Sequence, residues 1–132
     1  MVKICKWDRK KGYWGIKWKN EDFDYLVINI IQLLKFDYAE LCTFKGEIPR
    51  QIDYISINES EQFMYMTIDY NNSLKKLTTE LLENLRFFEL YLSLNDVIIA
   101  IFSSDNYGEF TSIDICKKYT RSEVEDLLKK IK

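Results

Sequence analysis

The chain has 132 residues, no histidine, three cysteines and a formal net charge of −2. A chain of this length can bury about two-thirds of its unfolded surface, so we expect residues 1–132 to form one domain without disulfides or metals. No stretch approaches the roughly 18 apolar residues of a membrane span, and the N-terminus lacks the apolar run of a signal peptide. We therefore expect a cytoplasmic protein that does not contact membranes, with Cys5, Cys42 and Cys116 as buried thiols.

The first predicted elements are a hairpin, a helix and a strand. Short alternating segments at residues 2–7 and 13–18 flank turn-forming residues, which predicts an antiparallel hairpin. Asn20 is a candidate N-cap, and the apolar residues after it recur at helical spacing, which predicts a helix over about 21–36. Its β-branched residues leave a buried strand as the alternative. Residues 38–44 predict the next strand.

A second hairpin and a second helix follow. Residues 52–57 and 63–70 lie on either side of a polar turn at 58–62, which predicts a hairpin. Asn71 and Asn72 are candidate caps for a long helix over about 73–89, because leucines recur there every three or four residues.

The last part of the sequence predicts a third hairpin and a short helix. Residues 96–102 and 109–115 are β-prone segments joined by a polar turn. Thr120 and Glu123 have the spacing of a capping box, and apolar residues follow at helical spacing. The fold class that results is α+β: a mostly antiparallel, hairpin-rich sheet of about six or seven strands, with two long helices and a short C-terminal one.

A shift of 51 residues aligns the two long predicted helices. Phe23 falls on Leu74 and Leu26 on Leu77, and each helix follows a hairpin and precedes an aromatic-rich segment. One interpretation is a tandem hairpin–helix–strand repeat. The other is a chance alignment, since two amphipathic helices of similar length can always be aligned in this way.

The residues that most enzymes use are scarce. Without histidine the chain lacks the commonest general base and the usual ligand of zinc and iron. Its four scattered glycines form no phosphate-binding loop. We therefore expect no enzyme, no cofactor and no metal site. The remaining catalytic alternative is a metal-dependent nuclease built on carboxylates and lysine, with Asp114 and Lys117 as the candidate pair.

The N-terminal hairpin is basic and aromatic. Cations attract phosphates, and flat rings offer stacking surfaces for unpaired bases. A nucleic-acid- or nucleotide-binding hairpin is therefore one functional hypothesis, with the candidate residues Lys6, Trp7, Arg9, Lys10, Lys11, Trp14, Lys17 and Trp18. Strand periodicity puts Trp14 and Trp18 on one face, and either they pack in the core or they contact a ligand.

The middle of the chain is acidic. Residues 20–70 hold ten carboxylates against Lys35, Lys45 and Arg50, interleaved with tyrosines. Tyrosine provides contact area at low entropic cost, and carboxylates steer association with basic partners. The candidate protein-binding residues are Asp53, Tyr54, Glu59, Glu61, Tyr65, Asp69 and Tyr70.

Acidic, tyrosine-rich surfaces are typical of bacterial toxin-immunity proteins and of phage inhibitors of host defence nucleases, CRISPR nucleases included. The leading hypothesis is therefore a non-catalytic inhibitor, a monomer or homodimer, that covers a basic surface of a toxin or defence nuclease.

Overall fold

One antiparallel sheet of eight strands organises the structure. The computed structural model describes residues 1–49, 52–69 and 76–131. The strand order is β1-β2-β8-β7-β6-β3-β5-β4. The strands are β1 (Val2–Ile4), β2 (Tyr13–Trp18), β3 (Tyr38–Phe44), β4 (Ser56–Glu59), β5 (Phe63–Asp69), β6 (Phe88–Leu94), β7 (Val97–Asp105) and β8 (Phe110–Cys116).

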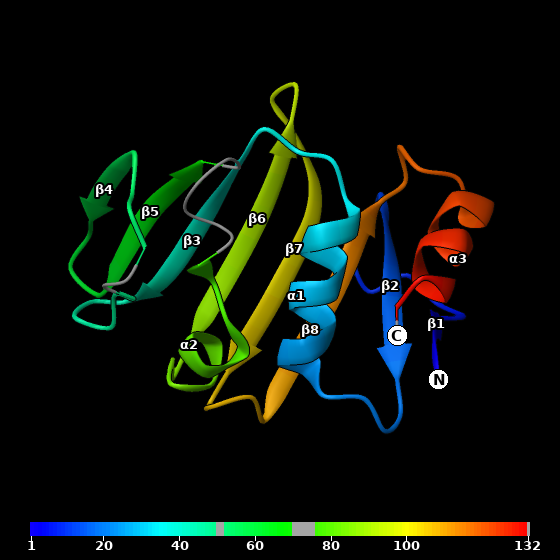
Figure 1. The fold of residues 1–132 in the computed structure, drawn as a ribbon, viewed down its shortest axis with the longest axis horizontal. Helices are drawn as coiled ribbons and strands as arrows, with labels where there is room; N and C mark the ends of the chain where they lie inside the picture. The colour runs from blue at the N-terminus through cyan, green and yellow to red at the C-terminus, as the bar shows by residue number, and fades with distance from the viewer. Residues whose placement is uncertain (50–51, 70–75, 132) are drawn as a thin grey trace.

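The helices of the described residues cover one face of this sheet (Figure 1). They are α1 (Phe23–Leu33), α2 (Thr79–Glu83) and α3 (Arg121–Lys129). Helix α1 contacts both of the others, and α3 packs against β1 at the end of the sheet. None of the helices in the described part of the chain is long and apolar enough to cross a membrane.

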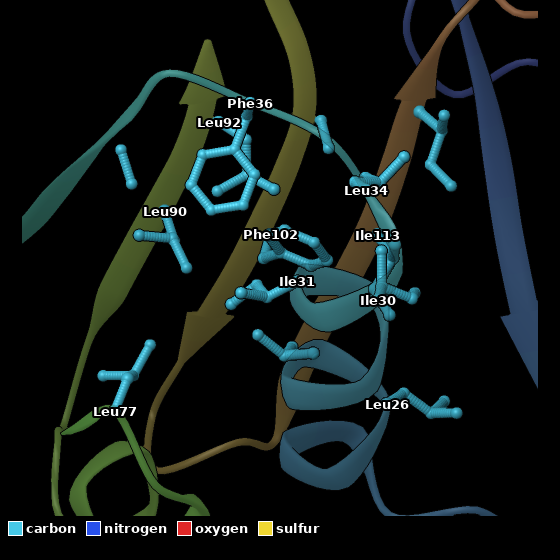
Figure 2. Close-up of a cluster of buried hydrophobic side chains, with 14 of the residues drawn as sticks. Leu26, Ile30, Ile31, Leu34, Phe36, Leu77, Leu90, Leu92, Phe102 and Ile113 are labelled. Atoms are coloured by element: carbon cyan, nitrogen blue, oxygen red, sulfur yellow. The ribbon is translucent and has the colours of Figure 1, made fainter. Parts of the chain in front are cut away.

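The hydrophobic core lies between the helices and the sheet. Its α1 side chains recur every three or four residues, so that they form one buried stripe facing the strands. Ile30, Leu90 and Phe102 are fully buried there. Figure 2 shows the cluster, with labelled members Leu26, Ile30, Ile31, Leu34, Phe36, Leu77, Leu90, Leu92, Phe102 and Ile113.

The helix and strand predictions for the first half are confirmed in outline. Residues 13–18 and 38–44 form strands with the predicted bounds. Helix α1 is shorter than predicted, and its N-cap is Asp22 rather than Asn20, because the Asp22 carboxylate accepts a hydrogen bond from the Asp24 backbone N–H.

The predicted long helix over 73–89 is wrong: among its described residues only Thr79–Glu83 form an α-helix. Helix α2 covers five residues, and its N-cap is Thr78; the predicted caps Asn71 and Asn72 lie outside the described residues. From Phe88 the chain is a strand, because Phe88, Leu90 and Leu92 alternate into the core with period two.

The strand β6 that replaces the end of this helix raises the count to eight, above the expected six or seven. The two predicted hairpins of the first half form as β1–β2 and β4–β5, but with shifted ends: β1 stops at Ile4, and β4 begins only at Ser56. The predicted C-terminal capping box is confirmed: Thr120 and Glu123 exchange side-chain and backbone hydrogen bonds. Three buried thiols were expected; Cys42 is buried, whereas Cys5 and Cys116 are partly exposed.

The order hairpin–helix–strand occurs twice, as β1-β2-α1-β3 and as β4-β5-α2-β6. Strands β3 and β6 lie side by side, and β8 and β7 separate the first hairpin from β6. The helices differ in length, with 11 residues in α1 and 5 in α2. A residue-by-residue repeat therefore stays a prediction.

Asp24 gives the fold a testable pH dependence. Burial, and then the charges of Asp22 and Glu83, raise the pKa of Asp24 to about 6. The folded chain thus holds this proton more tightly than the unfolded chain, whose Asp pKa is about 3.9. Ionised Asp24 therefore lowers stability at pH 7, and this loss fades as pH falls through 6.

We expect Asp24→Asn to raise the melting temperature by a few degrees at pH 7 and by much less near pH 4. Thermal unfolding at both pH values measures this, with Asp126→Asn on the exposed side of α3 as the control. An equal effect of Asp24→Asn at both pH values would contradict the interpretation.

Candidate functional site

The face of the sheet opposite the helices carries the candidate site. In a sheet, cross-strand partners share a face, and successive residues alternate between faces. Cys42 pairs with Tyr65 on one side and with Glu89 on the other, and Glu40 pairs with Tyr91. All of these side chains therefore lie opposite the core residues Leu41 and Leu90. We call this face the uncovered face.

A groove of about 560 Å³ is hollowed into the uncovered face across β5, β3, β6 and the start of β7. Cys42 and Ser93 at its floor are each 5% exposed, whereas Tyr65 at its wall is 37% exposed. We call it the open-face groove; its lining residues are Tyr38, Glu40, Cys42, Phe63, Tyr65, Phe87, Glu89, Tyr91, Ser93, Asp96 and Ile98.

The open-face groove is acidic. Glu40, Glu89 and Asp96 line it, and among the described residues of its lining there is no lysine or arginine. Within residues 1–49, 52–69 and 76–131, none of these three carboxylates forms an ion pair. Three negative charges in a partly enclosed hollow repel one another and favour a cationic ligand.

Hydrogen bonds orient Glu89 within the groove. The hydroxyl of Tyr91 donates to Glu89 Oε2 at 3.0 Å, and that of Ser103 donates to the same oxygen at 3.4 Å. The second oxygen, Oε1, has no hydrogen-bond partner among the described residues. The carboxylate is thus fixed by its neighbours while one oxygen stays available to a ligand.

Burial and the negative charges of the groove raise the pKa values of neighbouring groups. Burial, followed by the charges of Glu89 and Glu40, raises the pKa of the Cys42 thiol to about 11. Burial and the hydrogen bond to Glu89 also raise the pKa of Tyr91. The raised pKa values favour the neutral form of both groups at physiological pH.

A β-bulge and a tight turn shape one end of the groove. Ser93 pairs with Ile98 while Leu92 pairs with Ala100, so Ile99 is the extra residue of the bulge. Asn95 and Asp96 have φ values of 51° and 63°, as a two-residue turn between antiparallel strands requires. These features bring Asp96 and Ile98 to the groove although they lie next to a strand end.

Aromatic rings form the opposite end. The centroids of Phe44 and Phe87 lie 5.1 Å apart, and Phe63 lies 5.6 Å from Phe44 and 5.7 Å from Phe87. The guanidinium carbon of Arg86 lies 5.3 Å from the Phe44 ring centroid. This cluster thus already holds one arginine by a cation–π contact, just outside the groove lining.

The structure brings only part of the predicted acidic site to this face. Tyr65 lines the groove, and Asp69 lies beside its end because it pairs with Tyr38. Glu59 pairs with Met64 and therefore lies on the opposite face. Asp53 forms an exposed ion pair with Lys76 at 3.5 Å.

Of the other predicted members, Glu61 is exposed in the turn between β4 and β5. The Tyr54 ring packs against the core, and its hydroxyl donates to the Pro49 carbonyl. Tyr70 lies outside the described residues. The predicted cluster is therefore dispersed, and Tyr65 is its member in the groove.

The N-terminal hairpin uses two of its tryptophans internally. Trp14 and Trp18 pack against the core; the Trp14 indole N–H donates to the Tyr119 carbonyl, and Trp18 stacks on Phe23. Trp7 is 77% exposed. The predicted cations Lys6, Arg9, Lys10, Lys11 and Lys17 are all exposed, the first four in the β1–β2 loop and the last on β2.

Arg9 folds back onto the uncovered face above β2 and β8. Its Nη2 donates to the carbonyls of Ile16 and Ile113, each at 3.0 Å. Gly15 allows this approach, since a Cβ there would lie 3.1 Å from Arg9 Nε. Asp114 lies beneath, 4% exposed, with its Oδ1 3.8 Å from Arg9 Nη2. The uncovered face is therefore basic over β2 and acidic over β3 and β6.

The candidate nuclease pair is not assembled. Asp114 faces Arg9, whereas Lys117 forms an ion pair with Asp8 and lies 4.5 Å from the Trp14 ring centroid. Burial raises the pKa of Asp114, although the nearby Arg9 and Lys10 oppose the shift. No group of three or more cysteine or carboxylate side chains in the described chain could hold a metal ion.

The sequence did carry a signal for the missed groove residues. Glu40 and Cys42 alternate with the buried Ala39 and Leu41, and the β6 groove residues alternate with buried leucines in the same way. Polar and aromatic residues at every second position of two central strands indicate one common face. Their adjacency depends on the pairing of β3 with β6, which the sequence does not specify.

No protein-family model, curated protein or solved structure matches this chain.

The groove's potential predicts an order of thiol reactivity. Because only the thiolate reacts, the raised pKa and burial of Cys42 should make its alkylation at pH 8 far slower than that of Cys5 or Cys116. Iodoacetamide labelling followed by peptide mass mapping measures the three rates. Glu89→Gln should speed Cys42 labelling, because it removes a charge that raises the pKa of Cys42, and Glu125→Gln on α3 should not. Cys42 labelling as fast as Cys5 would contradict the described groove.

Proposed function

We propose that this chain is a non-catalytic binding protein, of the toxin-immunity or phage anti-defence inhibitor type, that binds a basic surface of its partner in the open-face groove. The observation that carries the proposal is a hollow lined by three carboxylates and several aromatic rings, with no cation of the described chain paired to those carboxylates. A cationic side chain would relieve the repulsion among Glu40, Glu89 and Asp96 and gain contact with the rings.

The rigidity of the site also supports binding. The groove lies on β5, β3, β6 and the start of β7, none of which is an edge strand, and the other face of these strands packs in the core. A site on rigid strands loses little conformational entropy when a partner docks. Tyrosines at the wall provide contact area of the kind that dominates binding energy in protein interfaces.

The nucleic-acid alternative has weaker support. A stacking surface needs accessible rings, and two of the three candidate tryptophans are committed to the protein interior. Trp7 and the surrounding lysines remain as a basic patch, and the acidic groove on the uncovered face would repel a phosphate backbone.

Charge reversal tests the proposed function. The partner is first isolated by cross-linking and co-purification with the wild-type chain, and its affinity is then measured by titration calorimetry. We expect Glu40→Lys/Glu89→Lys to weaken binding at least tenfold, about 1.4 kcal/mol, because it replaces attraction by repulsion in the groove.

The matched control is Glu125→Lys/Asp126→Lys, which makes the same charge change on α3, on the opposite side of the sheet. This variant should bind within about twofold of the wild type. Unchanged affinity in the groove variant, or equal losses in both variants, would show that the groove is not the binding site.

A further inference from the structure

We propose that the open-face groove binds the side chain of an arginine, with its guanidinium group between the Glu40 and Glu89 carboxylates and against the tyrosine rings of the wall. The inference rests on the proposed function, since it names the side chain by which a partner would be held. It follows from the spacing of the carboxylates, the free oxygen of Glu89 and the aromatic surfaces of the groove.

The spacing of the two carboxylates suits a guanidinium. Glu40 pairs with Tyr91, and Glu89 is two residues away on the same strand β6, so Glu40 and Glu89 are diagonal neighbours on one face. Such neighbours are about 7–8 Å apart. A planar guanidinium has five N–H donors in a fixed fork and can bond to acceptors on two sides, whereas an ammonium is a compact point charge.

The orientation of Glu89 fits the same ligand. Because Tyr91 and Ser103 both donate to Oε2, the carboxylate is held in place before a ligand arrives. Oε1 is then available to accept from the guanidinium. A charge-assisted hydrogen bond to a fixed carboxylate is stronger than a neutral one and costs little reorganisation.

The rings supply the remaining contacts. Tyr65 on β5 and Tyr91 on β6 lie on either side of β3: Tyr91 is beside Glu40, and Tyr65 is beside Cys42, two residues along β3 from Glu40. Arginine stacks on flat aromatic faces more often than lysine does. The contact of Arg86 with Phe44 shows that the adjacent aromatic cluster of this chain accommodates a guanidinium in this way.

The test uses small probes, so that it does not depend on a partner. Acetyl-arginine amide, acetyl-lysine amide and acetyl-citrulline amide are titrated into the full chain and followed by NMR. Citrulline has nearly the shape of arginine without its charge. We expect the arginine probe to shift resonances of Tyr65, Tyr91 and Cys42, and to bind about fivefold or more tightly than lysine. Citrulline should not bind detectably.

Two variants localise the binding. Glu89→Gln should abolish the arginine shifts, while Glu125→Gln should leave them unchanged, and the amide spectrum of each variant shows whether it is folded. The arginine assignment would be overturned if the lysine or the citrulline probe bound as tightly as the arginine probe. It would also be overturned if the arginine probe shifted resonances outside the groove, or did not bind at millimolar concentration.

These failures are distinguishable from failure of the proposed function. If the partner complex is weakened by Glu40→Lys/Glu89→Lys while the arginine probe shows no preference, the groove binds a basic partner by another side chain. If the probe binds in the groove but charge reversal leaves the partner complex intact, the proposed function is wrong and the arginine site remains.

Discussion

Helices α1, α2 and α3 pack against the same face of the sheet formed by β1 to β8, and the other properties of the described structure depend on this arrangement (Figure 1). Each strand has two faces, and the apolar residues of the central strands are used on the covered side. The uncovered face therefore carries the residues that alternate with the buried ones along each strand. Here these are tyrosines, carboxylates and a buried thiol, and they are not needed to close a core.

The uncovered face therefore carries side chains that the core does not use. Glu40, Glu89 and Tyr91 alternate with residues whose burial holds the strands in place, so the same strands that form the core also position the groove. The bulge at Leu92 and Ser93 and the turn at Asn95 and Asp96 complete one end. The two ends of the uncovered face therefore differ in charge: Arg9 is fixed over β2, and the carboxylates lie over β3 and β6.

Much of the fold could be predicted from the sequence, because period-two and period-3.6 patterns report which residues are buried. The hairpins, α1 and the Thr120 capping box were found in this way. The prediction of a long second helix failed because its leucines fit a helical stripe. In the structure Leu77, Leu82 and Leu85 are buried in and around the short helix α2, and Phe88 begins a strand. Local pattern could not decide between these outcomes.

The site was harder to predict for a different reason. The predicted site took its acidic residues and tyrosines from one continuous segment of the sequence. The groove instead combines β3, β5, β6 and the start of β7. The pairing of β3 with β6 joins residues about fifty positions apart. Tyr54 and Glu59 have the same residue types as the groove lining, but Tyr54 precedes β4 and packs against the core, and Glu59 pairs with Met64 and so lies on the opposite face. For Trp14 and Trp18 the sequence left open whether they pack in the core or contact a ligand, and their packing with Tyr119 and Phe23 decides for the core.

Hydrogen–deuterium exchange of the chain, alone and with its co-purified partner, tests the central claim most directly. If the uncovered face is the binding surface, protection on complex formation should concentrate in Tyr38–Phe44, Phe63–Asp69 and Phe88–Leu94, while α3 should exchange as in the free chain. Protection confined to the β1–β2 loop around Trp7, or to the helical face, would contradict the account.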